Sequence, residues 1–395
     1  MGKYSNVIPD GACDLLFKEC EARRAVEKSM VDIFKSRGFS EAATPSLEFY
    51  DVFSGNSSIM DDEMMYKLID ARGRILVLRP DNTTPMARIA STKLKGFLPP
   101  LRLCYNQNVF RISQYMSGRY DELAQCGIEL IGVRGEKADI EVILTAISAL
   151  KSVLGSDFRF EIGHVGFYKC IIDELPFDDD VKERIRSLIA SKSYASLNTM
   201  LEPYARDNAA CLALTELPRL FGGREVLDRA FSVAPNEASK QTVKYLQTLY
   251  NTLCDMGFES NIMLDLGLVQ QIEYYTDVVF KGYMHGTGEP VLSGGRYDGL
   301  FARFGADIPA TGFAVNADAI ARAIGERSKS NRPDVLIFFE KDAKSAFEHM
   351  ETFIASGLIC EMSVFETLDE TQKYAATKGI ERIDIIDGAS KTQEN

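Results

Sequence analysis

Four stretches of the sequence combine arginine, carboxylate, hydroxyl and tyrosine side chains near predicted strand ends, where a polar pocket is usually built on a sheet. Asp81 and Glu129 are acceptors suited to an ammonium group and to the N–H of an imidazolium, and Arg111 is a donor suited to a carboxylate or a phosphate. Together these groups would hold a zwitterion. The stretches are RPDNTT (79–84), FRISQYMSGRYDELAQCGIE (110–129), LGLVQQIEYYTD (266–277), and SGGRYDGL with GFAVNADA (293–300 and 312–319).

Each of these residues also has a purely structural interpretation. A single charged residue at a strand end can belong to an exposed ion pair, which contributes little to stability. One of Tyr274 and Tyr275 can be an ordinary strand aromatic, and we interpret SGGRYDG (293–299) as a structural glycine turn. The density of polar side chains over the four stretches favours the pocket.

Other catalytic and metal chemistries lack the residue patterns that they require. The three histidines, His164, His285 and His349, are far apart, and the eight cysteines include no C-x-x-C pair. These spacings argue against a metal site, a histidine-centred catalytic site and a disulfide framework. The sequence also contains no P-loop and no nucleophile elbow. We therefore expect no metal and no cofactor.

Composition and charge limit the classes of partner. The chain has 395 residues, of which 46% are hydrophobic, so it can bury a large core. Its 45 basic and 57 acidic side chains give a net charge of −12, which disfavours nucleic acid as a partner. No apolar stretch approaches the ~20 residues that a membrane-spanning helix needs. We expect a cytoplasmic protein without a membrane partner.

The hydrophobic patterns predict an α+β protein in which an antiparallel sheet positions the polar stretches. Alternation predicts strands at 101–111 and 122–133, and a short β-branched and Leu run predicts one at 74–80. Further strand signals lie at 159–163, 261–267 and 273–284, and helical periodicity indicates helices at 20–37 and 138–155 and from about Ala317. Continuous helical patterning separates two parts of this core. The predicted domains are a core of residues 1–174 and 257–327, a helical insertion at 175–256, and a small α/β domain at 333–395.

Residues 7–325 resemble histidyl-tRNA synthetases, which are class II synthetases. IPDGACDLLF (8–17) resembles the opening segment of that family, and GFSEAATPSLE (38–48), with Pro45, resembles motif 1, which forms a dimer interface there. The remaining likenesses are RPDNTTPMAR (79–88) to the histidine-binding loop, residues 110–129 to motif 2 and its following strand, LVQQIEYYT (268–276) to the histidine-specific segment, and GFAVNADA to motif 3. The resemblance implies a class II synthetase-like antiparallel sheet flanked by helices.

The resemblance also implies that a histidine pocket is retained. The family's ligand contacts fall on these positions: Asp81, Thr83 and Gln125 for the amino group, Glu129, Tyr274 and Tyr275 for the imidazole, and Arg111 and Arg119 as the motif 2 arginines.

The departures from the family pattern lie at the ATP end of the implied site. Ser113 replaces a motif 2 glutamate, Gln270 replaces an arginine over the reacting carboxylate, and Asn316, Asp318 and Ala319 replace the glycine, glutamate and arginine of motif 3. Activation of an amino acid depends on fixed cations around the α-phosphate. Because each lost cation costs on the order of 2.7–4 kcal/mol, losing two would slow activation by roughly four or more orders of magnitude.

The C-terminal domain does not have the charge of a tRNA-reading module. Residues 331–395 contain 7 Lys or Arg and 13 Asp or Glu, a net of −6, whereas such a module should be basic. We expect no tRNA partner.

These features together resemble the regulatory subunits of ATP phosphoribosyltransferase, which are non-catalytic relatives of the synthetases. The resemblance implies a short-form catalytic subunit as partner, histidine as the feedback ligand, and self-association as a dimer through motif 1. Histidine would shift the assembly between two quaternary states. Two alternatives stay open: a divergent working histidyl-tRNA synthetase, and a synthetase-like protein that binds another amino acid or regulates translation.

Overall fold

The computed structural model describes residues 4–54, 61–113, 120–206, 208–268, 274–325 and 332–386. The chain divides into two compact units, residues 1–326 and 327–395. Within the described ranges, no helix has both the length and the apolar character needed to cross a membrane.

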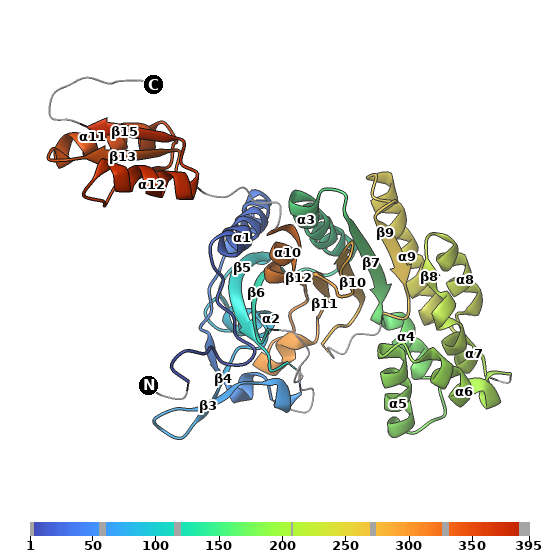
Figure 1. The fold of residues 1–395 in the computed structure, drawn as a ribbon. Coiled ribbons are helices and arrows are strands. Elements are labelled where there is room, and N and C mark those ends of the chain that lie inside the picture. The colour runs from blue at the N-terminus through green and yellow to red at the C-terminus, as the bar shows by residue number, and fades with distance from the viewer. Residues whose placement is uncertain are drawn as a thin grey trace. The chain divides into compact units, whose positions relative to one another are not determined.

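A nine-stranded sheet forms the centre of the first unit in its described residues (Figure 1). The central strands of the sheet, which run in space from β5 (Leu101–Phe110) to β7 (Phe158–His164), pair antiparallel. At the two sides, β1 (Ser40–Glu41) joins β5 in parallel and β9 (Ile262–Asp265) joins β7 in parallel. In spatial order the strands are β1 (Ser40–Glu41), β5 (Leu101–Phe110), β6 (Glu122–Ile131), β12 (Ala310–Asn316), β11 (Leu292–Arg296), β10 (Val278–Met284), β7 (Phe158–His164), β9 (Ile262–Asp265) and β8 (Phe221–Gly222).

Three helices cover one face of this sheet and enclose the main core. Val26, Met30 and Phe34 are buried at helical spacing, so one side of their helix packs against the sheet. Successive residues of a strand point to opposite faces of the sheet. On β12, Phe313 and Val315 belong to the core, so the residues that alternate with them point to the opposite face. The three helices are α1 (Lys18–Ser36), α3 (Glu136–Leu154) and α10 (Ala317–Ile324) (Figure 1).

Smaller elements build the other side of the sheet. Leu300 and Phe301 pack with α2 (Thr83–Ser91) in a separate apolar cluster that includes Tyr275 and Tyr297. A three-stranded antiparallel sheet of order β2-β4-β3 lies beside them. The elements are η1 (Tyr50–Val52), η2 (Asp62–Met64), α2 (Thr83–Ser91), η4 (Leu300–Phe304), β2 (Leu47–Phe49), β3 (Lys67–Ile69) and β4 (Ile75–Leu78).

A helical region follows β7 and returns to the sheet at β9. Its last helix begins at a capping box in which the Asn236 side chain accepts from the Ser239 N–H, a strong helix start. The region comprises α4 (Val165–Ile172), α5 (Asp179–Ala190), α6 (Tyr194–Ala205), α7 (Ala209–Glu216), η3 (Leu217–Arg219), α8 (Glu225–Val233) and α9 (Glu237–Asp255).

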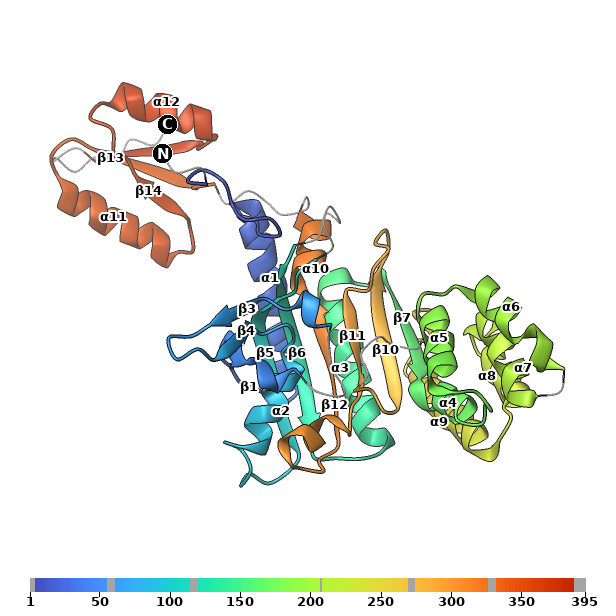
Figure 2. The same cartoon turned by 90° about the horizontal axis from the view of Figure 1, so that it is seen from below.

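The second unit is a parallel α/β fold of order β14-β13-β15 (Figure 2). Val335 and Ile337 pack with Ala346 of one helix, whereas Leu336 packs with Ala375 of the other, so the two helices cover opposite faces. The elements are β13 (Val335–Phe339), α11 (Ala343–Ala355), β14 (Cys360–Met362), α12 (Leu368–Lys378) and β15 (Arg382–Ile386).

The predicted α+β class is confirmed, but the strand predicted at 273–284 is wrong at its start. The strand β10 begins at Val278, and Tyr274 and Tyr275 precede it with ring centroids 4.8 Å apart. Consecutive strand residues would point to opposite faces. Two tyrosines that contact each other therefore require an irregular backbone at this point.

Candidate ligand-binding site

A cavity of about 390 Å³ lies on the sheet face that α1 and α3 leave open. Its walls come from β6, β11 and β12, from the N-terminal end of α2 and from the segment before β10. The volume suits a small ligand. Of the residues predicted for the pocket, those that line the cavity are Asp81, Thr83, Arg111, Gln125, Tyr274 and Tyr275.

Glu129 lies beneath the cavity wall and is only 1% exposed. Its carboxylate accepts a hydrogen bond from Thr83 Oγ1 at 2.8 Å and another from the Tyr297 hydroxyl. Burial raises the pKa of Glu129 to about 8, although these two hydrogen bonds act in the opposite direction. A carboxyl group that is protonated near neutral pH therefore lies at the closed end of the cavity.

Two glycines make room for these groups. A Cβ on Gly312 would lie 1.9 Å from Glu129 Oε2, and a Cβ on Gly295 would lie 2.7 Å from a ring carbon of Tyr275. Any larger residue at either position would have to displace the Glu129 carboxylate or the Tyr275 ring.

Tyr297 lines the cavity, although its segment SGGRYDG was predicted to be a structural glycine turn. Its hydroxyl donates to Glu129, and its ring lies edge-on to Tyr274 with centroids 5.7 Å apart. The pattern of a tyrosine two residues after the paired glycines carried the only sequence signal for this role. Tyr274, Tyr275 and Tyr297 thus form an aromatic wall around the carboxyl group.

Asp81 closes another side of the cavity at the start of α2. Its two carboxylate oxygens accept from the backbone N–H of Thr84 at 2.7 Å and from the Thr84 hydroxyl at 3.0 Å. Burial raises the pKa of Asp81, and the nearby Arg111 and the Thr84 hydrogen bonds oppose that shift. The carboxylate is therefore fixed in place before any ligand arrives.

Arg111 and Gln125 are also held by neighbouring groups. Arg111 Nε donates to the Pro80 carbonyl at 2.6 Å, and the Gln125 side-chain oxygen accepts from Asn82 Nδ2 at 3.3 Å. These contacts fix a guanidinium and an amide at the cavity wall, where they face the Asp81 side of the site.

Two residues near the predicted ATP end make contacts within the fold. Asp318 accepts from the Ala124 N–H at 2.6 Å and lies 3.5 Å from Arg23 Nε of α1, so its carboxylate is used inside the fold. Asn316 caps α10 by accepting from the Ala319 N–H at 3.0 Å. Gln270 and Arg119, which the sequence analysis also selected, lie outside the described residues.

Arg322 and Ser113 also line the cavity in this region. Arg322, one helical turn after Ala319, lines the cavity and lies over the ring of Tyr120 at 5.1 Å. The resemblance points only to position 319, where the family has its motif 3 arginine, so Arg322 was not predicted. Ser113 lines the same region, and its backbone N–H donates to Asp121 Oδ1 at 2.8 Å.

The described residues contain no group of three or more His, Cys, Asp or Glu side chains placed to hold a metal ion. The eight cysteines are free thiols. The arrangement can bind a small zwitterion through carboxyl, amide, hydroxyl and guanidinium groups.

Comparison with known proteins gives a consistent set of relatives. The family description that matches residues 11–320 is histidyl-tRNA synthetase. An ATP phosphoribosyltransferase regulatory subunit from Clostridium botulinum (strain 657) is 38% identical over 391 residues, which cover 97% of this chain and 92% of that protein.

Solved structures show the same likeness. The crystal structure of an ATP phosphoribosyltransferase regulatory subunit/histidyl-tRNA synthetase from Bacillus halodurans C has a TM-score of 0.87 at 29% identity and covers 98% of this chain and 100% of that chain. A histidyl-tRNA synthetase from Nostoc sp. PCC 7120 has a TM-score of 0.80 at 18% identity, with 97% and 92% covered, and shows the fold alone. The predicted class II synthetase-like fold is confirmed.

Proposed function

The chain belongs to the family of ATP phosphoribosyltransferase regulatory subunits, which has the histidyl-tRNA synthetase fold, and on that basis we propose that it is the non-catalytic regulatory subunit of this enzyme. In this role it acts in the first step of histidine biosynthesis. It is required for the activity of a short-form catalytic subunit and it confers feedback inhibition by histidine.

The proposal is supported by the contrast between two parts of the cavity, one that we assign to the imidazole of histidine and one that we assign to the altered ATP end. Glu129, Thr83 and Tyr297 form a connected hydrogen-bonded group at the first end. Near the proposed ATP end, Asn316 and Arg322 line the cavity, whereas Asp318 pairs with Arg23 within the fold and position 319 is an alanine. A site of this kind supports binding of the amino acid without its activation by ATP.

The ligand pose follows from the charges around the cavity. The ammonium group of histidine binds near Asp81, Thr83 and Gln125, and the imidazole binds against Tyr274 and Tyr275 with one N–H directed to Glu129. Arg111 faces the carboxylate. Gln270 remains part of this proposal as the neutral replacement for an arginine.

Calorimetric titration of the purified chain with histidine tests the pocket. We expect saturable binding of one histidine per chain, and much weaker binding of alanine, which lacks an imidazole for Glu129. Equal affinity for the two amino acids would contradict the assignment.

The affinity for histidine is expected to be level between about pH 6.5 and 8 and to fall on either side. Between the usual imidazole pKa of about 6.5 and the pKa of about 8 for Glu129, binding only moves a proton from Glu129 to the ligand. Below this range the imidazole of free histidine is already charged, so forming the ion pair between the imidazolium and the Glu129 carboxylate releases the Glu129 proton. Above it, forming the pair takes a proton up.

Titrations between pH 5.5 and 8.5, each in two buffers of different ionisation enthalpy, measure these proton changes. We expect release near pH 5.5, little exchange near pH 7.2, and uptake with declining affinity at pH 8.5. An affinity that rises steadily with pH would show that Glu129 binds the ligand in another protonation state.

Gly312→Ala is expected to weaken histidine binding at least about tenfold, because the new Cβ would lie 1.9 Å from Glu129 Oε2 and 2.4 Å from the Ile128 carbonyl oxygen, so that both Glu129 and the adjoining backbone must shift. Calorimetry measures the loss. Gly96→Ala is the matched control, since a Cβ at Gly96 would meet nothing within 4 Å. Unchanged histidine affinity in Gly312→Ala would show that the ligand does not depend on the position of the Glu129 carboxylate.

Self-association through the motif 1 region also belongs to the proposal. On the outer side of β2 and β3, Leu47, Phe49 and Leu68 are 45%, 44% and 43% exposed, whereas Glu48 between the first two is buried. A second copy of the chain would cover this apolar sheet face.

Phe49→Glu is expected to convert a dimer into monomers, because it places a charge on the face that the partner would bury. Sedimentation velocity measures the mass. Val364→Glu is the control, since Val364 is 88% exposed in the second unit. A dimer that persists in Phe49→Glu places the contact elsewhere.

A further inference from the structure

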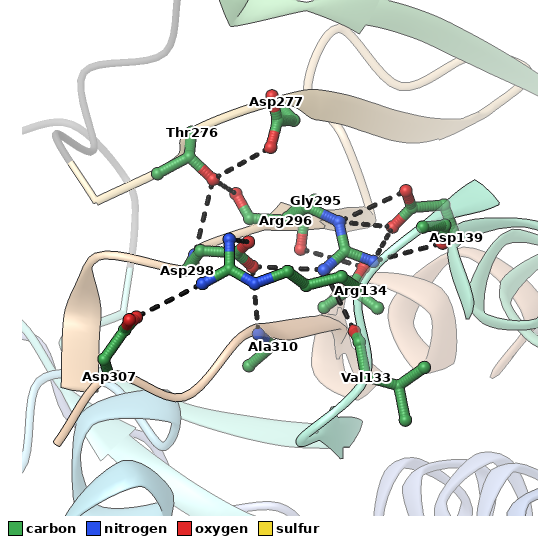
Figure 3. A network of polar contacts seen from close by, with 12 residues as sticks. Val133, Arg134, Asp139, Thr276, Asp277, Gly295, Arg296, Asp298, Asp307 and Ala310 are labelled. Carbon is green, nitrogen blue, oxygen red and sulfur yellow. Dashed lines mark hydrogen bonds and ion pairs between the residues drawn. The ribbon is translucent and has the colours of Figure 1, made fainter. Parts of the chain in front are cut away.

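A buried ionic network surrounds Arg296, the residue that precedes Tyr297 of the aromatic wall (Figure 3). At its centre is Arg296, the last residue of β11, whose guanidinium contacts Asp139 Oδ1 at 2.8 Å through Nη2 and Asp298 Oδ1 at 3.1 Å through Nη1. Arg296 and Asp139 are only 3% and 2% exposed. Because Asp139 is in the first turns of α3, the ion pair fixes the start of this helix to the end of β11.

The network adjoins both tyrosines that flank Glu129 in the site. Tyr297 lies between Arg296 and Asp298, and its backbone N–H donates to the Ala310 carbonyl at 2.8 Å. Thr276, which follows Tyr275, donates from its backbone N–H to the Arg296 carbonyl at 2.8 Å. In Figure 3, Thr276, Arg296 and Asp298 form one connected group. A shift of Arg296 would therefore move the backbone that carries both aromatic residues.

The same network reaches the helical region through α9. The hydroxyl of Tyr245 donates to Asp139 Oδ2 at 2.5 Å, and its ring packs edge-on against His164 with centroids 5.5 Å apart. Tyr245 thus connects α9 to Asp139 on α3 and to the cap residue of α4. A continuous set of contacts runs from Glu129 through Tyr297, Arg296 and Asp139 to Tyr245.

We propose that Arg296 is a positioning residue for the ligand pocket and that the Arg296–Asp139–Tyr245 contacts couple occupancy of the pocket to helix α9. This inference rests on the proposed binding of histidine. Ligand contact with Glu129 fixes Tyr297, which follows β11. The Arg296–Asp139 ion pair links β11 to α3, and the hydrogen bond from the Tyr245 hydroxyl to Asp139 links α3 to α9. Because coupling is reciprocal, any change that displaces α9 also changes the affinity for histidine.

Tyr245→Phe tests the coupling, because it removes a single hydroxyl group outside the pocket. We expect histidine affinity to fall about fivefold or more in calorimetry. Tyr250→Phe is the matched control, since Tyr250 is a buried tyrosine of the same helix whose hydroxyl neighbour is Cys254 rather than Asp139. We expect the control to bind histidine as the wild type does, with a similar loss of thermal stability.

Two further measurements separate coupling from a general structural role. In a Tyr297→Phe background, which lacks the hydrogen bond to Glu129, Tyr245→Phe should cause little additional loss of affinity. Histidine should also slow hydrogen exchange of α9 amides in the wild type and in Tyr250→Phe, but not in Tyr245→Phe.

The proposal is overturned if Tyr245→Phe binds histidine as tightly as the wild type, or if its effect is fully additive with that of Tyr297→Phe. Either result would leave the histidine pocket itself intact. A wild-type chain that binds no histidine would instead overturn the proposed function, and this inference with it.

Discussion

Glu129→Gln is expected to weaken histidine binding roughly 10- to 150-fold, because a hydrogen bond to a charged group contributes about 1.5–3 kcal/mol. Glutamine has nearly the same shape. The Thr83 and Tyr297 hydroxyls contact different oxygens of Glu129, so the amide oxygen of glutamine can accept from one of them and its NH2 group can donate to the other. What it cannot do is take on the negative charge that an imidazolium requires. The substitution should therefore weaken the contact with the imidazole and leave the rest of the cavity unchanged.

The same substitution should make the unliganded protein more stable at pH 8. Because burial raises the pKa of Glu129 from its usual 4.5 to about 8, the folded state favours the protonated form. Its contribution to stability is present below about pH 4.5 and is lost as the pH rises through 8. The shift corresponds to a loss on the order of 3–5 kcal/mol, which a neutral glutamine avoids.

Calorimetry and thermal unfolding at pH 4.5 and pH 8 measure both effects. The control is Glu48→Gln, which removes another buried carboxylate, one that pairs with Arg88 at 2.5 Å. This control should unfold at a lower temperature and bind histidine normally. If Glu129→Gln both bound histidine normally and unfolded at a lower temperature than the wild type at pH 8, Glu129 would have a structural role only.

Histidine-dependent exchange of pyrophosphate into ATP is expected to be at least about 10⁴-fold slower than in a working histidyl-tRNA synthetase. The reason is the loss of two cations that would stabilise the α-phosphate during attack, at positions 270 and 319. Arg111 and Arg322 still line the cavity, but neither occupies those two positions.

Ala319→Arg should not restore exchange by itself. Asn316 caps α10 and Asp318 pairs with Arg23, so neither is free to take the role of the family's motif 3 groups that we propose to be lost. Gln270 still lacks a charge. A radiolabelled pyrophosphate assay on the wild type, on Ala319→Arg and on a functional synthetase as positive control measures these rates. Robust exchange by the wild-type chain would favour the alternative of a divergent synthetase.

Much of the site could be predicted because its residues lie in short contiguous motifs. Asp81 and Thr83 come from one loop, and Gln125 and Glu129 come from one strand at spacing four, so alternation places them on one face. In the structure Asp81, Thr83 and Gln125 line one cavity with Arg111, and Glu129 lies beneath its wall in contact with Thr83. Their binding of histidine remains a proposal.

The remaining features depend on packing that the sequence does not display. Tyr297 reaches Glu129 from a segment that looks like a simple glycine turn, and Gly312 leaves the space that the carboxylate occupies. The irregular backbone at Tyr274 was predicted as strand because tyrosine and threonine favour strands. Tertiary contacts outweighed that preference, since Thr276 joins the Arg296 network.

We propose that this chain controls a catalytic subunit through a histidine pocket. Reconstitution of the two subunits tests that control directly. A short-form ATP phosphoribosyltransferase catalytic subunit is assayed alone, with the wild-type chain and with Glu129→Gln, over a range of histidine concentrations. We predict that both chains activate the catalytic subunit and that inhibition of the Glu129→Gln complex needs a roughly 10- to 150-fold higher histidine concentration than inhibition of the wild-type complex. Failure of the wild-type chain to activate, or equal inhibition of both complexes, would contradict the account.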